Sequence, residues 1–325
     1  MSQRDTVVTF VSDADIEAHV TLNDIVPAIE QAFIDLDAGN SEVFDVVRGR
    51  GGGDDHFFAI KSGRAGSIPA IGLKAGSYAP GNHKLGLQAH TSTTMLIDDI
   101  TGRPFAVVEA NYLNGIRTAA TNALATRCLA KADAKTLGVF GIGAQAIFET
   151  CAVASVRPIQ RVIACARSTA QQGAFADAIR KQLNLDVEFA DARTTCENAD
   201  VLVTVTPSRA PLFSREWVRP GTHISAMGAD NVGKQELEVE LVAQSKLWVD
   251  LPSQAVAIGE TQHAFRAGRI TLAQLEQQTL GRLLSRPELQ GHHPDAITVF
   301  DSSGIAIQDI AAAYAALQVV TKRKR

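Results

Sequence analysis

The second part of the chain, from Lys135 onward, alternates short apolar runs with helical segments. The first apolar runs are TLGVF, QRVIACA, DVEFA and DVLVTVT, and the helical segments AQAIFETCAVAS and AQQGAFADAIRKQL separate the first three of them. Continuous apolar runs of this length are typical of strands buried on both faces, and their alternation with helices predicts βαβ units and a parallel sheet. The later runs THISAMG, KLWVDL and AITVFDS continue the series.

A glycine-rich loop joins the first of these strands to its helix. The segment GVFGIGAQAIFET supplies Gly141, Gly143 and Ala146 in the spacing G-x-G-x-x-A, with Ala144 and Gln145 between them. The first glycine allows a tight turn, the second lets the backbone approach a pyrophosphate, and the alanine permits close packing of helix on strand. Between a strand and a helix, this pattern predicts a Rossmann dinucleotide-binding domain.

The end of the second strand bears on which dinucleotide is bound. A carboxylate about 20 residues after the loop would bind the ribose hydroxyls of NAD. The chain instead reads ACARST, which has no acid and places Arg167 and Ser168 at that point. An arginine there suits the additional phosphate of NADP. We therefore expect NADP(H) to be favoured, with NAD(H) as the alternative.

A chain of 325 residues exceeds what one hydrophobic core usually serves, so two domains are expected. The first part contains the strand-like runs FFAIKSG, AIGLKAGSY, TSTTMLIDD and PFAVVEA between glycine-rich turns, which predicts a mostly antiparallel sheet. The alanine-rich segment NYLNGIRTAATNALATRCLA predicts a long helix, and IAIQDIAAAYAALQVV predicts a final apolar helix, which could return to pack on the first domain. We predict an α/β protein with an α+β domain at residues 1–120, completed by 305–325, and a Rossmann domain at 121–304.

Composition narrows the class of protein. Hydrophobic residues make up 46% of the chain, charged residues 20%, and the net charge is -4, which gives no global attraction to nucleic acid or acidic membranes. The chain has four cysteines without zinc-like spacing, and it has neither an apolar signal core at its start nor an apolar run long enough to span a membrane. We expect a cytoplasmic protein without a metal site.

Several basic residues gather in the glycine-rich part of the first domain. They are Arg48 and Arg50 in VVRGRGGG, Lys61 in AIKSGR, and Lys74 in GLKAGSY, and Arg117 follows in what we expect to be the first turn of the alanine-rich helix. A cation near a helix N-terminus is unfavourable with the helix dipole, so helix formation does not explain Arg117. Together these residues could form a clamp for a carboxylate, although separate solvated charges are the alternative.

Polar residues also follow the later strands. Asp230 comes shortly after the strand ending at Met227, Thr206 follows DVLVTV, and Ser303 and Gly304 follow the last strand. The carboxyl ends of parallel strands are where such folds place ligands. We therefore predict cofactor contacts from Thr206, Met227 and Ser303, with ordinary turn chemistry as the alternative for Thr206 and for the turn that contains Ser303. His56, His90 and His223 have no visible carboxylate partner and are expected to be structural.

Five segments, in this order, carry a resemblance to a known family. GLKAGSY, IRTAATNALAT, GIGAQA, GADNVGKQEL and FDSSGIAIQDIAAA resemble the ornithine cyclodeaminase/mu-crystallin family over roughly residues 40 to 318. The resemblance implies a nicotinamide-binding Rossmann domain and a substrate and dimerisation domain built from both ends of the chain. It also implies a homodimer assembled through the sheets of that domain.

The resemblance carries over to individual residues. Lys74 and Arg117 match positions that hold the substrate carboxylate, and Arg48 or Arg50, of which we favour Arg48, would join them with Gly304 nearby. Asp230 matches the catalytic acid of the family, and Lys74 is a second candidate for the chemistry. Mu-crystallins lack that aspartate, so its presence favours an enzyme.

One departure concerns the substrate. Cyclodeaminases carry a Glu-x-Met-Pro-like element before the GLK lysine, where this chain reads FFAIKSGR and places Lys61 at or near the carboxylate. A lysine there would repel the amine of ornithine and attract an acidic side chain. Members with a KSG element resemble imine reductases acting on iminosuccinate or on cyclic imino acids such as pyrroline-2-carboxylate.

These features predict an NAD(P)H-dependent reductase of a small α-imino acid, reversible as an amino-acid dehydrogenase. Asp230 would either protonate the substrate nitrogen or stabilise an iminium ion as a carboxylate, and the sequence leaves both open. Ornithine cyclodeaminase and a non-catalytic NADPH-binding protein of the mu-crystallin type are the alternatives.

Overall fold

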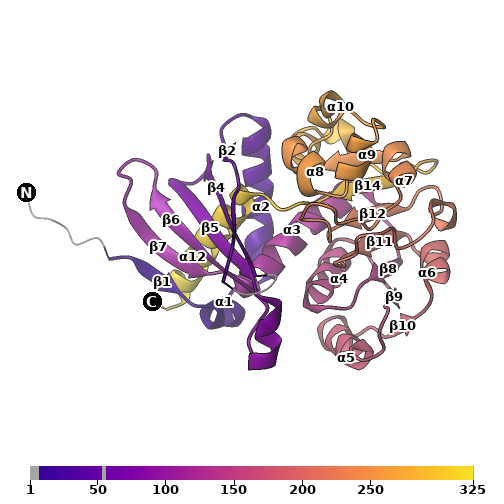
Figure 1. Ribbon diagram of the computed structural model, residues 1–325, viewed down its shortest axis with the longest axis horizontal. Coiled ribbons are helices and arrows are strands. Elements are labelled where there is room, and N and C mark those ends of the chain that lie inside the picture. Colours follow the sequence, from indigo (N-terminus) through magenta and orange to yellow (C-terminus); the bar gives the residue numbers. More distant parts are fainter. Residues whose placement is uncertain (1–6, 53–55, 325) are drawn as a thin grey trace, which may run out of the picture. The chain divides into compact units, whose positions relative to one another are not determined.

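The computed structural model describes residues 7–52 and 56–324, apart from the side chain of His83. Two compact units make up the chain: the first comprises Met1–Arg117 and Ile305–Arg325, and the second comprises Thr118–Gly304. Each unit has a sheet of its own (Figure 1).

The first unit is built on a mostly antiparallel sheet. Its strands are β1 (Thr9–Val11), β2 (Glu42–Val43), β3 (Val47–Arg50), β4 (Phe57–Ala65), β5 (Ala70–Tyr78), β6 (His90–Asp98) and β7 (Pro104–Glu109). The order is β1-β7-β6-β5-β4-β2, and β3 also pairs with β4. All pairs are antiparallel except β1 with β7, which are parallel.

Helices cover one face of this sheet. The first unit contains α1 (Asp13–His19), α2 (Leu22–Asp37), the 3-10 helix η1 (Pro80–Leu85) and α12 (Ala306–Arg323), and the start of α3 (Asn111–Leu129). The final helix α12 contacts α2 and strands β4, β5 and β6. A Cβ added at Gly72 would lie 3.1 Å from the Ile310 side chain, so β5 and α12 pack closely.

The long helix α3 was predicted, but the place of Arg117 within it was wrong. Helix α3 begins at Asn111, so Arg117 belongs to its second turn rather than its first. The helix dipole acts mainly within the first turn, and it therefore bears less on Arg117 than the sequence suggested.

The second unit is built on a parallel sheet in the order β10-β9-β8-β11-β12-β14-β13. The strands are β8 (Thr136–Phe140), β9 (Arg161–Cys165), β10 (Val187–Phe189), β11 (Val201–Thr204), β12 (His223–Ala226), β13 (Lys246–Val249) and β14 (Thr298–Asp301). The order reverses between β8 and β11, where such folds bind dinucleotides. The predicted Rossmann fold is confirmed.

Short helices connect these strands. They are α4 (Ala144–Val156), α5 (Gln172–Leu183), α6 (Ala192–Asn198), η2 (Arg215–Trp217), α7 (Val239–Gln244), α8 (Pro252–Ile258), α9 (Gln262–Arg266), α10 (Leu272–Glu276), α11 (Leu280–Ser285) and η3 (Pro287–Leu289). All residues of β11, β12 and β14 are buried, including the polar residues of β12 and β14, which are His223, Ser225, Thr298 and Asp301. Among residues 7–52 and 56–324, no helix is long and apolar enough to cross a membrane, and no group of side chains could hold a metal ion.

Candidate functional site

The loop between β8 and α4 has the geometry of an anion site. Gly141 has a φ of +99°, and a Cβ there would lie 2.7 Å from the Val205 carbonyl oxygen. Gly143 is the N-cap of α4, no side chain caps the helix there, and a Cβ at this position would meet no atom within 4 Å. Gly141 is therefore required by the fold, whereas Gly143 and the exposed Ala144 leave open the space in front of the helix N–H groups.

Behind the loop, a buried carboxylate fixes the first turn of α4. The Gln145 side-chain amide donates to Glu149 Oε1 at 2.6 Å, and the Asn122 amide donates to Glu149 Oε2 at 2.7 Å. Glu149 and Ala146 are fully buried. Because its side chain is engaged inside the protein, Gln145 would contribute to an anion site through its backbone N–H.

The chain after β9 carries the two residues predicted to select the cofactor. Arg167 and Ser168 are both exposed, and the Ser168 hydroxyl accepts from the backbone N–H of Ala170 at 3.2 Å. The next acid along the chain at these strand ends is Asp191, whose carboxylate caps α6 by accepting from the Thr194 N–H at 2.7 Å. This surface therefore presents a cation where NAD-specific domains present a carboxylate.

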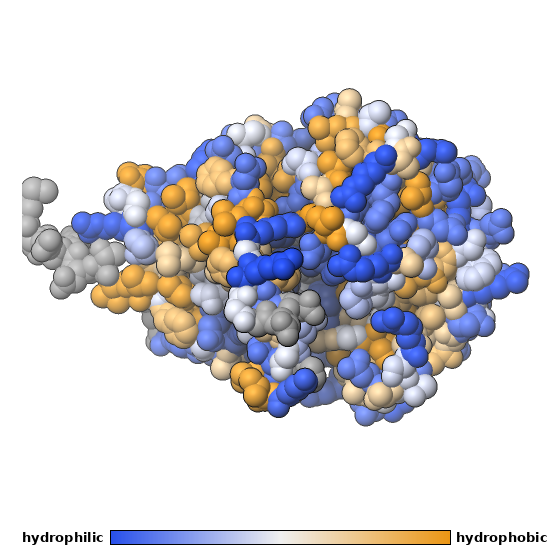
Figure 2. Space-filling view, viewed as in Figure 1, coloured by the Kyte–Doolittle hydropathy of each residue, from blue (hydrophilic) through white to orange (hydrophobic). Residues whose placement is uncertain are grey.

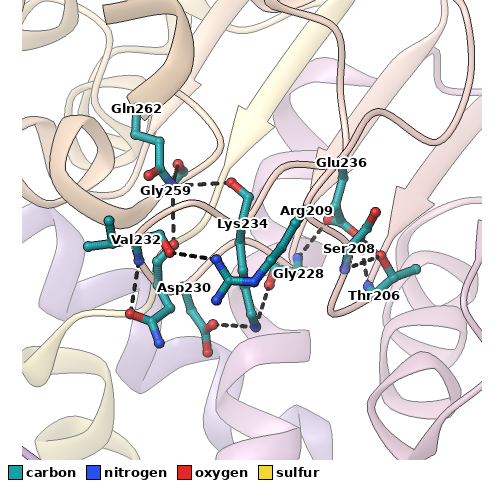
Figure 3. A network of polar contacts seen from close by, with 11 residues as sticks. Thr206, Ser208, Arg209, Gly228, Asp230, Val232, Lys234, Glu236, Gly259 and Gln262 are labelled. Carbon is teal, nitrogen blue, oxygen red and sulfur yellow. Dashed lines mark hydrogen bonds and ion pairs between the residues drawn. The ribbon is translucent and has the colours of Figure 1, made fainter. Parts of the chain in front are cut away.

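Asp230 lies on the loop that follows β12 (Figure 3). Its side chain is 59% exposed, and its Oδ1 accepts from Lys234 Nζ at 2.6 Å. Lys234 Nζ also donates to the Gly228 carbonyl oxygen at 3.1 Å. The acid is thus paired with a cation from its own loop, which the sequence analysis did not foresee.

The buried carboxylate of Glu236 links the start and the end of this loop to the end of β11. Its Oε1 accepts from the Thr206 N–H at 2.6 Å and the Thr206 hydroxyl at 2.8 Å, and its Oε2 accepts from the Thr204 hydroxyl at 2.7 Å and the Gly228 N–H at 3.0 Å. Complete burial raises the pKa of Glu236, against these hydrogen bonds. The Thr206 hydroxyl therefore donates within the protein, so a cofactor contact from it would have to use its lone pairs.

A second layer of side chains holds the same segment. Both Glu260 oxygens accept from the Glu236 N–H at 2.9 Å, and Gln262 Oε1 accepts from the Gly233 N–H at 2.8 Å. The Gln262 amide also donates to the carbonyls of Asn231 and Lys234. Burial, with the neighbouring Glu236, raises the pKa of Glu260 well above its usual value. The loop path is therefore set by buried groups.

The turn after β14 is fixed by Asp250. The Ser303 hydroxyl donates to Asp250 Oδ1 at 2.8 Å and the Gly304 N–H donates to Asp250 Oδ2 at 2.7 Å. Ser303 and the predicted cofactor neighbour Met227 are both buried, and Gly304 has a φ of +72°. These contacts give Ser303 and Gly304 a structural part, and their predicted roles in binding stay predictions.

In the first unit, two of the predicted basic residues share one buried acid. Asp309 Oδ1 lies 2.7 Å from Lys74 Nζ and 3.1 Å from Arg117 Nε. The Asn114 side-chain oxygen accepts from Lys74 at 3.1 Å and from Arg117 at 2.6 Å, and Gln308 accepts from Arg117 at 3.1 Å. All three ionisable side chains are under a tenth exposed. The cations are thus oriented from three sides.

Charge balance in this cluster favours losing a proton from Lys74. Burial, together with the charges of Arg117 and Lys61, lowers the pKa of Lys74 to about 7, although Asp309 opposes the shift. Burial alone would raise the pKa of Asp309, but Lys74 and Arg117 outweigh it and hold that pKa below its usual value. The arrangement is a carboxylate shared by two buried cations, with Lys61 close enough to affect the pKa of both Lys74 and Asp309, and it is suited to an anionic ligand.

Register places two further predicted residues on the same face of the sheet. Lys61 lies directly opposite Lys74 in the β4–β5 pair, and Arg48 lies opposite Ala59, two residues before Lys61. Arg48 is therefore a diagonal neighbour of Lys61, at about 7–8 Å between backbones. Arg50 pairs with Phe57, one step further away. The geometry favours Arg48 over Arg50.

Of the histidines considered, His223 has a clear structural role. Its Nδ1 hydrogen-bonds the Thr298 hydroxyl at 2.8 Å, and its Nε2 hydrogen-bonds the Ser225 hydroxyl at 3.2 Å. Complete burial lowers the pKa of His223 to about 3, so the ring is neutral at physiological pH.

The sequence analysis missed Asn114, Asp309, Lys234 and Glu236. Asp309 carried a signal, because a lone acid in the apolar helix IAIQDIAAAYAAL has no solvated face to occupy. Glu236 lies in a short polar segment, KQELE, and nothing in that segment separates it from a solvated acid.

Comparison with known proteins adds three relatives. The chain is 37% identical over 309 residues to the iminosuccinate reductase of Paracoccus denitrificans, covering 95% of each protein. The crystal structure of that enzyme in complex with NAD+ matches with a TM-score of 0.92 at 36% identity, over 98% of this chain and 97% of that one.

The other two relatives act on different compounds. An alanine dehydrogenase of Archaeoglobus fulgidus is 32% identical to this chain, and the match covers 93% of this chain and 92% of that enzyme. The structure of an archaeal alanine dehydrogenase dimer with bound NAD matches with a TM-score of 0.90 at 30% identity, over 98% of this chain and 97% of that one. A Delta(1)-pyrroline-2-carboxylate reductase of Bacillus cereus is 34% identical over 76% of each chain. A model of the ornithine cyclodeaminase/mu-crystallin family matches residues 6–323. The chain belongs to the ornithine cyclodeaminase/mu-crystallin family.

Proposed function

We propose that the protein is an NAD(P)H-dependent reductase of a small α-imino acid, reversible as an amino-acid dehydrogenase. The observation that carries the proposal is the buried pair of cations, Lys74 and Arg117, oriented by Asp309 on a face that also presents Lys61. Two buried cations that converge fit an α-carboxylate, which can accept charge-assisted hydrogen bonds from both. The relatives named for imine reduction and for alanine oxidation support the same reaction class.

Lys61 extends the proposal to an acidic substrate. It lies beside Lys74 on the same face, with Arg48 as its diagonal neighbour, so a second carboxylate would find two further cations. We therefore favour a dicarboxylate such as iminosuccinate over a cyclic imino acid such as pyrroline-2-carboxylate. The similarity to an iminosuccinate reductase supports this order.

The chemistry transfers a hydride to the carbon of a C=N bond. The dinucleotide would be held at the N-terminus of α4 by Gly143, Ala144 and Gln145, and it supplies the hydride when bound. Lys74 and Arg117 would hold the α-carboxylate, and Asp230, which matches the catalytic acid of the family, would act on the substrate nitrogen. Asp230 then either donates a proton or stabilises the iminium ion.

We further propose that NADPH is preferred to NADH. Arg167 and Ser168 are exposed after β9, where a guanidinium can reach the 2′-phosphate of NADP. Arg167→Asp should weaken binding of NADPH far more than binding of NADH, measured by titrating each nucleotide. Equal loss of both affinities would contradict this preference, and the relatives with bound NAD make NADH the necessary comparison.

A homodimer through the sheet of the first unit completes the proposal. Along β5, residues buried against α12 alternate with half-buried apolar ones such as Ile71 and Leu73 on the opposite face, and Phe10 of β1 is 59% exposed. Figure 2 shows apolar side chains gathered over β1, β6 and β7. Leu73→Glu should therefore give a monomer in light scattering, whereas an unchanged mass would contradict this interface.

The test of the reaction is a panel of 2-oxo acids with ammonia or methylamine, together with cyclic imino acids, scored by oxidation of NADPH and NADH. Turnover of the oxaloacetate and ammonia mixture is expected to be fastest. Asp230→Ala should lower kcat by about a hundredfold while NADPH still binds. If NADPH binds but no imine is reduced, a mu-crystallin-like binding protein is the better assignment; if ornithine alone yields proline and ammonia, the protein is a cyclodeaminase.

The cytoplasm is the proposed location. The four cysteines are free thiols, as expected for a reducing compartment that also holds reduced nicotinamide nucleotides.

A further inference from the structure

Lys234 joins two points of the loop that carries Asp230. Its Nζ donates to Asp230 Oδ1 at 2.6 Å and to the Gly228 carbonyl oxygen at 3.1 Å (Figure 3). The ammonium group therefore has two fixed acceptors, and the lysine side chain is 22% exposed while that of Asp230 is 59% exposed. Lys234 is therefore the more buried partner of the pair, and the carboxylate of Asp230 is the more exposed one.

The backbone of this loop is held by contacts other than the Lys234–Asp230 pair. Glu236 accepts from the Gly228 N–H at the start of the loop, and Gln262 accepts from the Gly233 N–H near its end. Arg209 donates to the Val232 carbonyl oxygen at 3.2 Å, and a ring nitrogen of His263 lies 2.9 Å from the Lys234 carbonyl oxygen. Removing the lysine side chain should therefore leave the path of the loop in place, so that its effect is felt mainly at the carboxylate of Asp230.

We propose that Lys234 is a positioning residue that holds Asp230 in its ionised form and orients its carboxylate toward the substrate nitrogen. The inference rests on the proposed function and chooses between the two roles left open for Asp230. An ammonium ion at 2.6 Å stabilises the carboxylate relative to the carboxylic acid. Asp230 then acts by stabilising the iminium ion and not by donating a proton.

The reaction balances without a proton from Asp230. The bound substrate is an iminium ion, whose nitrogen already carries the proton and donates N–H to the carboxylate. Hydride transfer from the reduced nicotinamide forms a C–H bond at the imine carbon, and the C=N π electrons become the nitrogen lone pair. The nicotinamide is oxidised, the iminium is reduced to a neutral amine, and the amine takes a proton from solvent afterwards.

The alternative is that this is an ordinary surface ion pair. Such pairs contribute about 0–1 kcal/mol and are screened by salt. The chain offers a matched example in Arg193 and Glu197, an i,i+4 pair at 2.7 Å whose side chains are 66% and 45% exposed. That pair lies on helix α6 and has no connection to Asp230.

The experiment compares Lys234→Met, Lys234→Arg and the control Arg193→Met in the full chain. With oxaloacetate and ammonia, Lys234→Met should lower kcat about tenfold and move the acidic limb of the pH profile to higher pH. Lys234→Arg should restore most of kcat because it restores the cation. Affinity for NADPH and the melting temperature should stay unchanged in all three variants, and Arg193→Met should match the wild type throughout.

Other charges near the loop must be accounted for in that pH profile. Among the described residues they include Arg209, Glu236, Glu260 and His263, which contact the loop. All four are kept in every variant, so a difference between Lys234→Met and the wild type follows from loss of the lysine ammonium group. A wild-type kcat and pH profile in Lys234→Met would overturn the proposal. So would loss of NADPH affinity or of thermal stability together with activity, because that result would make Lys234 merely structural.

A second measurement tests the role of Lys234 independently of whether the protein reduces an imine. The carboxyl carbon of Asp230, labelled with carbon-13 and assigned by its loss in Asp230→Asn, should titrate at a higher pH in Lys234→Met than in the wild type. If the wild type reduces no imine, the proposed function fails, yet this titration still reports whether the lysine holds the acid ionised. An identical titration in the two proteins would overturn the inference alone.

Discussion

Lys61 and Lys74 lie directly opposite each other on the neighbouring antiparallel strands β4 and β5. Like charges in this relationship are destabilising, and the pair costs more when one member, Lys74, is only 7% exposed. Asp309 lies 2.7 Å from Lys74, and the charge of Lys61 also helps to lower the pKa of Asp309. The anionic substrate proposed above would further reduce the repulsion between the two lysines.

Replacing Lys61 should change substrate preference more than catalysis. Lys61→Met removes a cation assigned to the second carboxylate, so KM for the iminium of oxaloacetate should rise about tenfold while KM for that of pyruvate changes little. Steady-state assays with each oxo acid and ammonia measure the difference. Lys84→Met is the control, because Lys84 is an exposed lysine of η1 in the same unit and has no assigned role. A substrate profile that does not change would refute the role of Lys61.

The lowered pKa of Lys74 predicts how activity depends on pH. With a pKa of about 7, Lys74 loses its positive charge as the pH rises through neutrality, and the free enzyme then holds the α-carboxylate less tightly. Since kcat/KM reports groups of the free enzyme, it should fall above about pH 7. Lys74→Arg keeps its charge at high pH and should flatten this limb. Any pH dependence of the substrate itself is the same for both proteins, so the wild type measured in parallel controls for it. A limb that persists unchanged in the arginine variant would assign it to another group.

Asp309 is expected to matter through the two cations that it orients. Asp309→Asn removes the counter-charge that Lys74 and Arg117 share, which costs about 3–5 kcal/mol unless Lys74 gives up its proton. KM for the imino acid should therefore rise at least tenfold, while the Kd for NADPH stays at the wild-type value. Asp35→Asn, a buried acid of helix α2 in the same unit, should change neither. A wild-type KM in Asp309→Asn would show that Asp309 is not needed to orient Lys74 and Arg117.

The fold of the second unit could be predicted because strands buried in a parallel sheet have continuous apolar sequences. TLGVF, DVLVTVT and AITVFDS became β8, β11 and β14 at nearly the expected bounds. The order of the strands could not be read in this way. Strand β14 lies between β12 and β13, and the parallel pairing of β1 with β7 joins segments 97 residues apart, from Thr9 to Ala106; both depend on packing that no local pattern encodes.

The candidate site was predictable in its cations and less so in its acids. Lys74, Arg117 and Asp230 stood out because their segments match a family pattern. The contacts that orient these residues could not be predicted because the partners are far apart in the sequence: Lys74 and Asp309 are separated by 235 residues. Glu236 is another case: its carboxylate reaches back to Thr204 and Thr206, and only the fold brings these residues together.

The two glycines of the nucleotide loop should respond differently to alanine. Gly141→Ala forces a side chain into positive φ and places a Cβ 2.7 Å from the Val205 carbonyl, so it should destabilise the protein by about 2 kcal/mol or more. Gly143→Ala meets open space and should cost about 0.5 kcal/mol. Its methyl group would instead occupy the room that we assign to the pyrophosphate, so NADPH affinity should fall at least tenfold. Denaturant unfolding and nucleotide titration separate the two effects, and unchanged affinity in Gly143→Ala would move the phosphate site elsewhere.

Glu236→Gln tests whether a buried carboxylate holds the Asp230 loop. Each Glu236 oxygen accepts from one backbone N–H and one hydroxyl. A hydroxyl can turn toward another acceptor, but the backbone N–H facing the new amide group cannot. One buried donor is left unpaired, at a cost of about 1–3 kcal/mol.

The size of that loss should depend on pH, with a sign that follows from the raised pKa of Glu236. The unfolded chain ionises this group near its ordinary value of 4.5, whereas burial keeps the proton on in the folded protein to higher pH. The folded state therefore binds more protons above the unfolded value of 4.5, and wild-type stability falls as the pH rises from there through the raised pKa of the folded protein. Glutamine has no proton to lose, so the stability gap between the two proteins should narrow with rising pH. Denaturant unfolding at several pH values measures the gap, and hydrogen exchange of residues 228–236 reports whether the loop has loosened. A gap that widens with pH would mean that Glu236 is ionised in the fold and stabilised by its four donors.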